Sequence, residues 1–433
     1  MNTIQRRTFL NTVSAASLVS LAGCTGFLSD DSIALEDPIE TAQDSPDWPQ
    51  VRHDTLNTGH NPSATGPLTS PEEAWAIEYG DGGPWTNPVV IDETVFIGGD
   101  RVNALDLRSG EERWSREIEG HTFQGVAASG DVLYIGSRTT RETDGERIII
   151  PYMNCFDVMT GELRWSEPLD EGYRFNQVRP PTVIGGLVVS ASTNHYAIFR
   201  AADGERIWHS ARLSSLAPPA CTSSHLVIRY HSGGAVFEWD GPLDEPIARL
   251  PAQDHYIPPV MQDEYVLLAE SVMIAPEDNL GTIRLYNVEG TTLGNLGSLS
   301  NIVSAPIVDG DKTGYLAAAA WHTDDGDGDV REAFVRSFDL TDGSTNWETR
   351  YPDSEYASAG PTPTVTYDFP TLSGTSLFVS FTHNGIQPVV HCLDPRDGDE
   401  RWSHQVSGSV GELVVIDDVL LVPTYDGRLV ALH

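Results

Sequence analysis

The stretch VNALDLRSGEERW, residues 102–114, states a pattern that this chain repeats. A short apolar stretch ends on Leu or Phe, a Gly follows five positions later, and a Trp stands four positions after that. The other copies are MNCFDVMTGELRW (153–165), YAIFRAADGERIW (196–208), VRSFDLTDGSTNW (335–347) and VHCLDPRDGDERW (390–402). Self-similarity of this kind is the mark of a repeat architecture, so we expect one body built from copies of one unit.

Two short β-rich runs joined by a turn belong to each copy. They are β-branched and bounded by Gly, Asp or Pro, and nothing between them keeps a helical period, which predicts strands. The paired runs are 88–91 with 94–97, 125–128 with 132–135, 182–184 with 187–190, 220 with 226–230, 259–261 with 265–269, 305–308 with 315–319, 363–367 with 377–381, and 413–416 with 419–423. Each unit is therefore predicted to hold four strands, the third ending near the Leu or Phe and the fourth carrying the Trp.

The repeated glycine stands where a hairpin of three to five residues needs one residue at positive φ. We expect tight turns between the third and fourth strands at Gly110, Gly161, Gly204, Gly343 and Gly398. Two copies, around 237–241 and 286–290, have a turn one residue shorter and lack the Trp. A unit of about 40 to 55 residues with four strands is typical of a propeller blade.

The two ends of the chain each carry part of one blade. The last segment, 427–433, is a third strand that stops before the hairpin Gly, and the segment 71–75 supplies a Trp without the strands that should precede it. Pairing these segments closes a ring and removes its open edges. The sequence thus predicts an all-β fold over residues 70–433, an eight-bladed β-propeller of four-stranded antiparallel blades closed by its N- and C-terminal strands.

The repeat resembles the pyrroloquinoline-quinone-type propeller repeat, A-x-D-x-x-T-G-x-x-x-W. The best matches are 104–114, with Asp106, and 157–165. The resemblance implies that each Trp docks against a neighbouring blade, and an aromatic recurring once per blade is expected to be interblade core on packing grounds as well. These residues are Trp75, Trp114, Trp165, Trp208, Trp347 and Trp402. The segment 48–59 also resembles a leader found before such propellers, and we expect residues 48–69 to pack on one face of the ring.

The charge of the chain excludes polyanionic partners. Asp and Glu number 63 against 26 Lys and Arg, a formal charge of −37, so nucleic acid and anionic membrane surfaces would be repelled. Lys312 is the sole lysine. An acidic, nearly lysine-free surface is typical of salt-loving microbes, and we interpret the charge as a haloarchaeal habitat; cation binding is the alternative.

The N-terminus resembles an export and lipidation signal. Residues 5–10 resemble a twin-arginine signal, the apolar run 13–21 is too short for a stable membrane span, and 21–24 resemble a lipobox. We expect residues 1–23 to be removed, Cys24 to carry lipid, and 24–47 to form an acidic tether on the extracellular face of the cytoplasmic membrane. A chance Cys behind an ordinary secretory signal is the alternative.

The remaining residues offer no strong catalytic or metal signature. Cys155, Cys221 and Cys392 are odd in number, which argues against a disulfide framework. Motifs such as His-Glu-x-x-His, Gly-x-Ser-x-Gly and the P-loop are absent, and the acidic run 324–329 lacks the Gly and Glu of an EF-hand. In alcohol dehydrogenases of the quinoprotein family an adjacent Cys-Cys pair caps the cofactor, and this chain has none. We expect no catalytic residue, no metal and no cofactor.

Insertions point to a candidate binding face. The long stretches 137–151, 270–281 and 321–332 are all connections between second and third strands, which emerge on one face of a propeller; the opposite face has minimal turns, with one exception between 366 and 374. Insertions on one face usually mark the binding face, although loops also drift where folding tolerates them. The candidate contact residues are Trp85, Arg174, Phe175, Asn176, Gln177, His255, Tyr256, Trp321, His322 and Tyr356.

These observations lead to a first hypothesis and two alternatives. The first is a monomeric, non-catalytic, lipid-anchored propeller that binds a protein or another ligand outside the membrane. The second is a divergent quinoprotein oxidoreductase for alcohols or sugars, using pyrroloquinoline quinone and Ca²⁺. The third is a relative of the outer-membrane assembly scaffold propeller, in which case the fold would transfer without the function, because a haloarchaeon is not expected to have an outer membrane.

Overall fold

The computed structural model describes residues 33, 35–36, 43, 45–80, 87–143, 145–173, 176–210, 217–230, 233–251, 257–270, 282–298, 302–324, 328–352, 369–381 and 388–433. Side chains are described for these residues except 143, 270, 297–298, 302–303, 319–324 and 328–332. Ser32–His433 form one compact unit. The described part of this unit contains strands and turns and no helix, so nothing in it resembles a helix able to cross a membrane.

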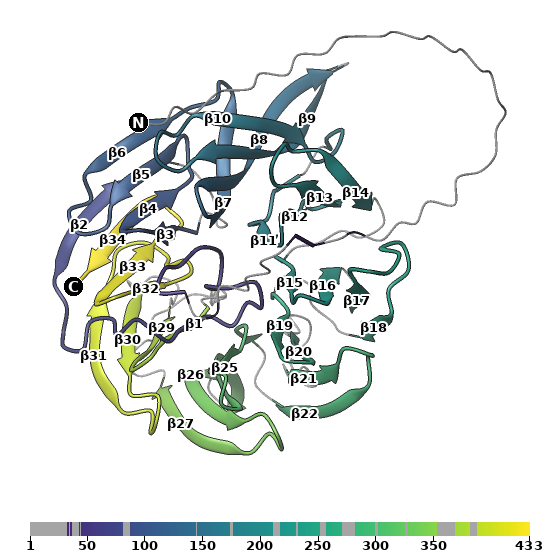
Figure 1. Cartoon of the computed structure of the whole chain (residues 1–433). Coiled ribbons are helices and arrows are strands. Elements are labelled where there is room, and N and C mark those ends of the chain that lie inside the picture. Colours follow the sequence, from purple (N-terminus) through teal and green to yellow (C-terminus); the bar gives the residue numbers. More distant parts are fainter. Residues whose placement is uncertain are drawn as a thin grey trace, which may run out of the picture. The chain divides into compact units, whose positions relative to one another are not determined.

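The described strands form eight sheets arranged as a ring (Figure 1), which confirms the predicted eight-bladed β-propeller. Blades are numbered in chain order, and their strands are: blade 1, β3 (Val89–Ile91), β4 (Thr94–Ile97), β5 (Val102–Asp106) and β6 (Glu112–Arg116); blade 2, β7 (His121–Ser129), β8 (Val132–Thr143), β9 (Glu146–Asp157) and β10 (Leu163–Pro168); blade 3, β11 (Thr182–Ile184), β12 (Leu187–Ala191), β13 (Tyr196–Arg200) and β14 (Arg206–Ser210); blade 4, β15 (Ala220–Cys221), β16 (His225–Tyr230), β17 (Gly233–Glu238) and β18 (Ala248–Pro251).

The second half of the ring repeats the same antiparallel order with small additions. Its strands are: blade 5, β19 (Val260–Gln262), β20 (Tyr265–Glu270), β21 (Thr282–Asn287) and β22 (Thr292–Ser298); blade 6, β23 (Ile302–Val303), β24 (Ile307–Val308), β25 (Thr313–Asp324), β26 (Gly328–Asp339) and β27 (Thr345–Pro352); blade 7, β28 (Thr371–Ser373), β29 (Leu377–Phe381), β30 (Val389–Leu393) and β31 (Glu400–Gln405) with β1 (His60–Asn61); blade 8, β32 (Val414–Ile416), β33 (Val419–Pro423), β34 (Arg428–Leu432) and β2 (Glu73–Glu78).

The ring is closed by strands from opposite ends of the chain. β2 runs antiparallel to β34, with Trp75 opposite Ala431 and Glu78 opposite Arg428. Glu72 and His433 exchange backbone hydrogen bonds at 3.1 Å in both directions, and Figure 1 shows β2 along the outer side of β34. The terminal fragments recognised in the sequence therefore complete one blade, as predicted.

The repeated tryptophans of blades 8, 1, 2 and 6 each contact the next blade at its repeated glycine turn. The indole Nε1 of Trp75 donates to Leu107 O at 2.9 Å, that of Trp114 to Val158 O at 2.9 Å, and that of Trp165 to Ala201 O at 3.0 Å. A Cβ added to Gly110 would lie 2.7 Å from the Trp75 ring, and Gly110 has a φ of 70°. Glycine is thus required there both by the turn and by the indole packed on it. The same turn conformation recurs at Gly161, Gly204, Gly343 and Gly398.

Two of these tryptophans differ from the rest. Trp208 reaches only the carboxylate of Asp244, at 3.4 Å. Trp402 of blade 7 has no such hairpin turn to dock on, because the third and fourth strands of blade 8, β34 and β2, are not consecutive in the sequence, and its Nε1 instead donates to Pro67 O at 2.8 Å. The leader thus supplies an acceptor that the last repeat lacks. Trp347 follows the regular pattern, donating to Pro395 O at 2.9 Å.

The prediction that residues 363–367 form the inner strand of blade 7 was wrong. Residues 363–367 lie outside the described residues, and the inner strand is β28, inside the region predicted as a long turn between 366 and 374. The hairpin that follows it is short, since β29 begins at Leu377. β28 is fixed by a partner far away in the sequence, because Leu372 and Ser373 pair with His60 and Asn61 of β1. No local pattern could have revealed that pairing.

Two predicted insertions are strands rather than loops. Residues 137–143 of β8 pair with 146–152 of β9, and residues 321–324 of β25 pair with 328–331 of β26. Pairing satisfies the backbone groups of both arms, and the β8–β9 arms also contain three Thr and three Ile, which favour strands, so the strands run on past the edge of the blade. The third predicted insertion falls largely on 271–281, outside the described residues. Of the acidic run, Asp324 pairs with Gly328 at the hairpin end.

The three cysteines of the ring are buried and free, as expected. Cys155, Cys221 and Cys392 lie in three different clusters of buried side chains. Burial raises the pKa of the Cys155 thiol to about 12 and that of Cys392 to about 11, so neither is a reactive thiolate at neutral pH.

Candidate interaction face

The two faces of the ring differ. The turn face carries the hairpins from first to second and from third to fourth strands, such as 107–111 and 185–186. The insertion face carries the connections from second to third and from fourth to first strands, such as 192–195 and the tip of the β8–β9 hairpin at 143–146. The extended hairpins of blades 2 and 6 both belong to the insertion face, and these blades stand four apart in a ring of eight.

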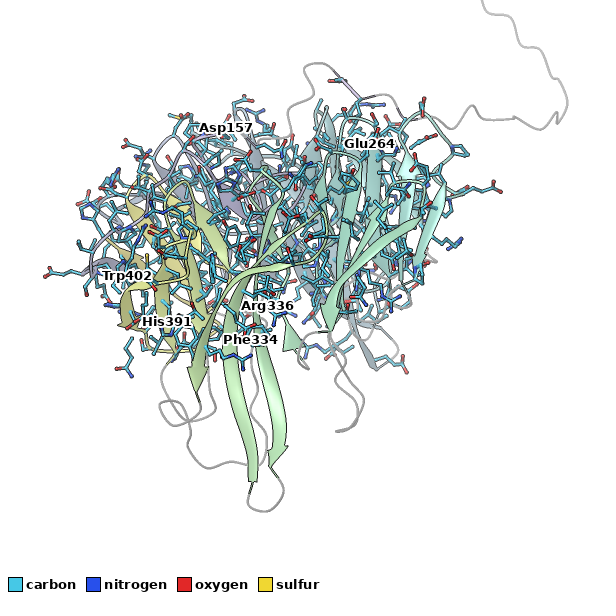
Figure 2. The ribbon with its side chains drawn as sticks, turned by 90° about the horizontal axis from the view of Figure 1, so that it is seen from below. Asp157, Glu264, Phe334, Arg336, His391 and Trp402 are labelled. Atoms are coloured by element: carbon cyan, nitrogen blue, oxygen red, sulfur yellow. The ribbon has the colours of Figure 1, made fainter. Side chains whose placement is uncertain are left out.

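The hairpin of blade 6 continues well past the body of the ring. Figure 2 shows it as two long paired strands, with Phe334 and Arg336 near its base. Arg336 packs over the Phe334 ring at 5.0 Å and donates from Nε to the Glu348 carboxylate at 2.7 Å. These contacts join the base of the hairpin to β27.

Most of the residues predicted for this face lie outside the described residues, namely Trp85, Arg174, Phe175, His255, Tyr256 and Tyr356. Trp321 and His322 lie in β25, opposite Arg331 and Val330 of β26, but their side chains are outside the described set. Asn176 and Gln177 are described. The backbone N–H of Gln177 donates to Thr193 Oγ1 at 3.0 Å.

Asn176 is part of a buried polar cluster centred on Asp170. Its amide donates to both Asp170 carboxylate oxygens, at 3.1 and 3.0 Å. Asp170 also accepts from Gly172 N at 2.7 Å and from Ser192 Oγ at 3.0 Å, and the His195 ring lies 3.1 Å from the same carboxylate. The cluster ties the connection between blades 2 and 3 to the 192–195 loop. Asn176 therefore supports the insertion face from within instead of presenting its side chain on it.

The combination of Ser192, His195 and Asp170 does not form a nucleophile relay. In a relay the histidine stands between the hydroxyl and the carboxylate, so that it can take the hydroxyl proton. Here the serine and the histidine both bind one oxygen of Asp170. The arrangement can hold two loops together, but it offers no activated nucleophile.

Tyr173 is a residue of this face that the sequence analysis missed. It is 46% exposed, its ring lies 5.5 Å from that of His195, and its backbone exchanges hydrogen bonds with Ile149 of β9 at 2.8 and 3.1 Å. Tyr173 directly precedes the predicted cluster 174–177, so extending that cluster by one residue would have included it. Asp170 and His195 carried no such signal, because 25 residues separate them.

A second buried polar centre lies on the ring axis, where the leader packs. Arg52 is 1% exposed. Its guanidinium donates to three carbonyl oxygens, Asn57 O at 2.9 Å, Thr58 O at 3.4 Å and Pro306 O at 2.6 Å, and it lies 5.5 Å from the Phe369 ring centre. Burial lowers the pKa of Arg52 to about 10, against the opposing effect of nearby carboxylates.

Glu412 of blade 8 joins this centre. One carboxylate oxygen accepts from Arg52 N at 2.6 Å and the other from Asn87 Nδ2 at 2.7 Å. Burial raises the pKa of Glu412 to about 7, and the charge and backbone N–H of Arg52 oppose this rise. The pair links the leader to blades 1 and 8, which are the blades that meet where the ring closes.

The described residues contain no group of three His, Cys, Asp or Glu side chains suited to a metal ion. Fold and site together define a class, an eight-bladed β-propeller whose polar leader fills the axis and whose hairpins extend from one face.

Comparison with known proteins gives the family. A family model described as "Outer membrane protein assembly factor BamB" matches residues 98–238 and 331–433, more than half of the chain. The chain belongs to this family of propeller repeats. Two curated relatives have the same printed name. The protein of Bordetella pertussis is 26% identical over 211 residues, which cover 48% of this chain and 44% of that one. The protein of Burkholderia pseudomallei is 25% identical over 146 residues, which cover 33% of this chain and 34% of that one. The chain thus spans less than half the length of these relatives.

Solved structures support the fold. BamB from Moraxella catarrhalis matches with a TM-score of 0.56 and 16% identity, over 84% of this chain and 97% of that one. The computationally designed Ika8 protein matches with a TM-score of 0.61 and 14% identity, over 83% of this chain and 99% of that one. Sqt1 from Saccharomyces cerevisiae matches with a TM-score of 0.55 and 10% identity, over 84% of this chain and 98% of that one. At these identities the likeness concerns the fold alone.

Proposed function

We propose that the protein is a non-catalytic scaffold that is attached to the extracellular face of the cytoplasmic membrane through lipid on Cys24 and binds a partner protein with its insertion face. The family supports the binding role, because the printed names of the relatives describe an assembly factor. The paired hairpins of blades 2 and 6 and the exposed Tyr173 supply the contact surface. The strongest single observation is that the long ordered extensions described in this ring stand on one face.

The course of the N-terminal segment supports the choice of face. Ile33 N donates to Trp239 O at 3.0 Å, and Glu36 N donates to Gly185 O at 2.8 Å. Both acceptors belong to turns of the turn face, in blades 4 and 3. Ile33 and Glu36 therefore lie against the turn face, which leaves the insertion face free to bind a partner.

The quinoprotein alternative is less well supported. Its planar cofactor would stack on the ring axis, and in this chain leader side chains from Trp48 to Thr58 occupy the axis at the level of the inner strands. Adding pyrroloquinoline quinone and Ca²⁺ is therefore expected to leave the melting temperature unchanged. A rise in melting temperature together with dye-coupled oxidation of an alcohol or sugar would replace the scaffold proposal with the enzymatic one.

Site-specific photo-crosslinking tests the scaffold proposal. A photoreactive side chain at Tyr173, on the insertion face, is expected to crosslink a membrane-associated or extracellular protein in cells. The matched control carries the same group at Met159, which is 80% exposed on the turn face, and should give no such product. Replacing residues 142–147 by Asn-Gly joins the register partners Arg141 and Ile148 with a tight turn and should abolish the crosslink without unfolding the ring.

Two results would contradict the proposal. The first is equal crosslinking from residues 159 and 173, or crosslinking from 173 that persists in the shortened hairpin. The second is the absence of any product from 173 in intact cells. The attachment is tested separately, because Cys24→Ser should move the protein from the membrane fraction to the soluble fraction, and continued sedimentation with membranes would show that the lipid is not the anchor.

A further inference from the structure

The leader makes one complete circuit of the ring axis and contacts the inner strand of every blade in order. Inner strands of a propeller are sheet edges, whose outward N–H and C=O groups need partners. Between residues 48 and 61 the leader is almost entirely buried, and its buried polar or charged residues are Gln50, Arg52, His53, Asp54, Thr55, Asn57, Thr58 and Asn61. In Figure 1 this dark purple segment winds through the middle of the ring.

Seven inner-strand N–H groups, one from each of blades 1 to 7, donate to the leader. The donors and acceptors, in order, are Val90 N to Trp48 O at 2.8 Å, Ala128 N to Pro49 O at 2.7 Å, Val183 N to Gln50 Oε1 at 3.1 Å, Cys221 N to Thr55 O at 2.6 Å, Met261 N to Leu56 O at 2.9 Å, Val308 N to Thr58 O at 3.4 Å, and Leu372 N to Gly59 O at 2.9 Å.

Blade 8 completes the circuit with the direction of donation reversed. The Asn61 amide donates to Val415 O at 3.1 Å, and the backbone N–H groups of Thr65 and Gly66 donate to Asp417 O at 2.6 and 2.8 Å. These last bonds lie at the turn between β32 and β33, on the turn face. Asp47, at the other end of the leader, also accepts from Asp92 N in a turn of that face, at 3.2 Å. The leader thus enters and leaves the axis on the turn face.

The conformation of the leader is specific to this site. Arg52, His53, Asn57 and Gly59 all have positive φ, between 55° and 74°. The Asp54 carboxylate accepts from Leu56 N and Thr58 N, each at 3.0 Å, which holds the middle of the segment in a tight coil. A Cβ added to Gly59 would lie 2.7 Å from a guanidinium nitrogen of Arg52. Side chains thus shape the segment so that its carbonyls point outward to the blades.

From this geometry we propose that the ring axis is a peptide-binding site whose ligand is the polar segment 48–66 of the same chain. The bound segment acts as a clasp. It joins the eight inner strands into one cooperative body and closes the turn-side mouth of the axis. This inference does not depend on the proposed partner or on the lipid anchor.

Hydrogen exchange of the seven donor amides tests the clasp. In the full chain all seven should be protected although they sit on sheet edges, because the leader accepts from each of them. Gly59→Ala should loosen the coil and speed the exchange of all seven by about tenfold or more, since they would open together. The amide of Trp114 in the outer strand β6 is the control and should keep its wild-type rate.

The result separates a clasp from a set of local contacts. If Gly59→Ala speeds only Val308 and Leu372, whose acceptors adjoin residue 59, the blades do not depend on the leader jointly and the proposal fails. It also fails if the seven amides are unprotected in the unaltered chain. Gly130→Ala is the matched substitution, at another glycine with positive φ but with no neighbour within 4 Å of the added Cβ, and it should leave all seven rates unchanged.

Addition of the ligand in trans provides a second test. A chain beginning at residue 68 is expected to show weakened protection of the inner strands, and a synthetic peptide of residues 45–67 should restore it in a saturable way. The same peptide with Arg52 replaced by Ala should not. If the shortened chain fails to fold alone, it is refolded with each peptide. Recovery of the protected ring with the unaltered peptide supports the site. Failure with both peptides overturns the binding-site proposal, even where Gly59→Ala speeds the exchange of all seven amides in the full chain.

Discussion

Replacing Arg52 by Ala is expected to lower the free energy of unfolding by about 3 to 5 kcal/mol, the usual cost of removing one partner from a buried charged network. The change leaves the carbonyls of Asn57, Thr58 and Pro306 without their shared donor. It also removes a positive charge that favours the ionised form of the buried Glu412 carboxyl group. Because these groups belong to the leader and to blades 6 and 8, the loss should weaken the ring as a whole. Denaturant unfolding followed by tryptophan fluorescence measures the effect.

Arg101→Ala is the matched control for this substitution. Arg101 pairs with Glu117 at 3.2 Å, but both side chains are more than half exposed, so the same loss of an arginine should change the unfolding free energy by only about 0.5 kcal/mol or less. If Arg52→Ala proved as mild as Arg101→Ala, the axial network would not contribute to holding the ring together. A loss confined to the leader, seen as faster exchange at residues 48–61 with an unchanged ring, would also contradict the account.

The second large effect is expected from Glu412 and depends on pH. Burial raises its pKa from 4.5 to about 7 in the folded protein, so between these pH values the folded state binds more protons than the unfolded state. The contribution of Glu412 to stability therefore falls as the pH rises from about 4.5 to 7. Glu412→Gln cannot ionise and should lose this dependence. The stability of the variant relative to the wild type should rise across the window by about 3 kcal/mol at most.

The comparison must be made between the two chains at each pH, because other groups titrate in the same range. Burial lowers the pKa of His60, for example, to about 4. The contribution of His60 to stability therefore rises with pH, opposite to that of Glu412, but His60 is present in both chains and its contribution cancels in the comparison. Asn87 can turn its amide to match the new side chain, so the variant should fold. A difference in unfolding free energy that stays flat from pH 4.5 to 7, or that falls, would show that Glu412 is not held in the buried environment described.

Much of the ring could be predicted from the sequence because its information is local and repeated. A glycine at fixed distance from a tryptophan encodes a hairpin turn and the surface on which the indole of the preceding blade docks, as Gly110 and Trp75 show. The closing blade followed from counting, since a third strand without a fourth at one end matched an orphan tryptophan at the other. These features need no knowledge of distant contacts.

Most features that could not be predicted depend on partners far away in the sequence. β28 is set by its pairing with the leader. The arms of the β8–β9 and β25–β26 hairpins have near partners, but their polar residues gave no strand pattern, and only their mutual pairing shows them to be strands. The circuit of the leader was invisible for a related reason. Its polar residues have no hydrophobic period, and their positions are fixed by backbone groups of eight separate blades.

The candidate site was predicted less well than the fold. The sequence chose the face from the lengths of its insertions, but it could not tell which polar residues point outward. Asn176 proved to be buried against Asp170, whereas its neighbour Tyr173 is exposed beside the β8–β9 hairpin. The predicted cluster included Asn176 and left out Tyr173, because nothing in the local sequence shows that the Asp170 carboxylate holds the Asn176 side chain inward.

The central claim is that one ring is closed by strands from opposite ends of the chain, and a disulfide tests it most directly. Glu78 and Arg428 are register partners in β2 and β34, and partners in an antiparallel pair are close enough for a disulfide. In a chain with Cys24→Ser, the pair Glu78→Cys and Arg428→Cys should form an intramolecular crosslink on mild oxidation, seen by peptide mapping, whereas Glu112→Cys with Arg428→Cys should not. Absence of the 78–428 crosslink in the folded protein, or equal crosslinking of the control pair, would contradict the closed ring.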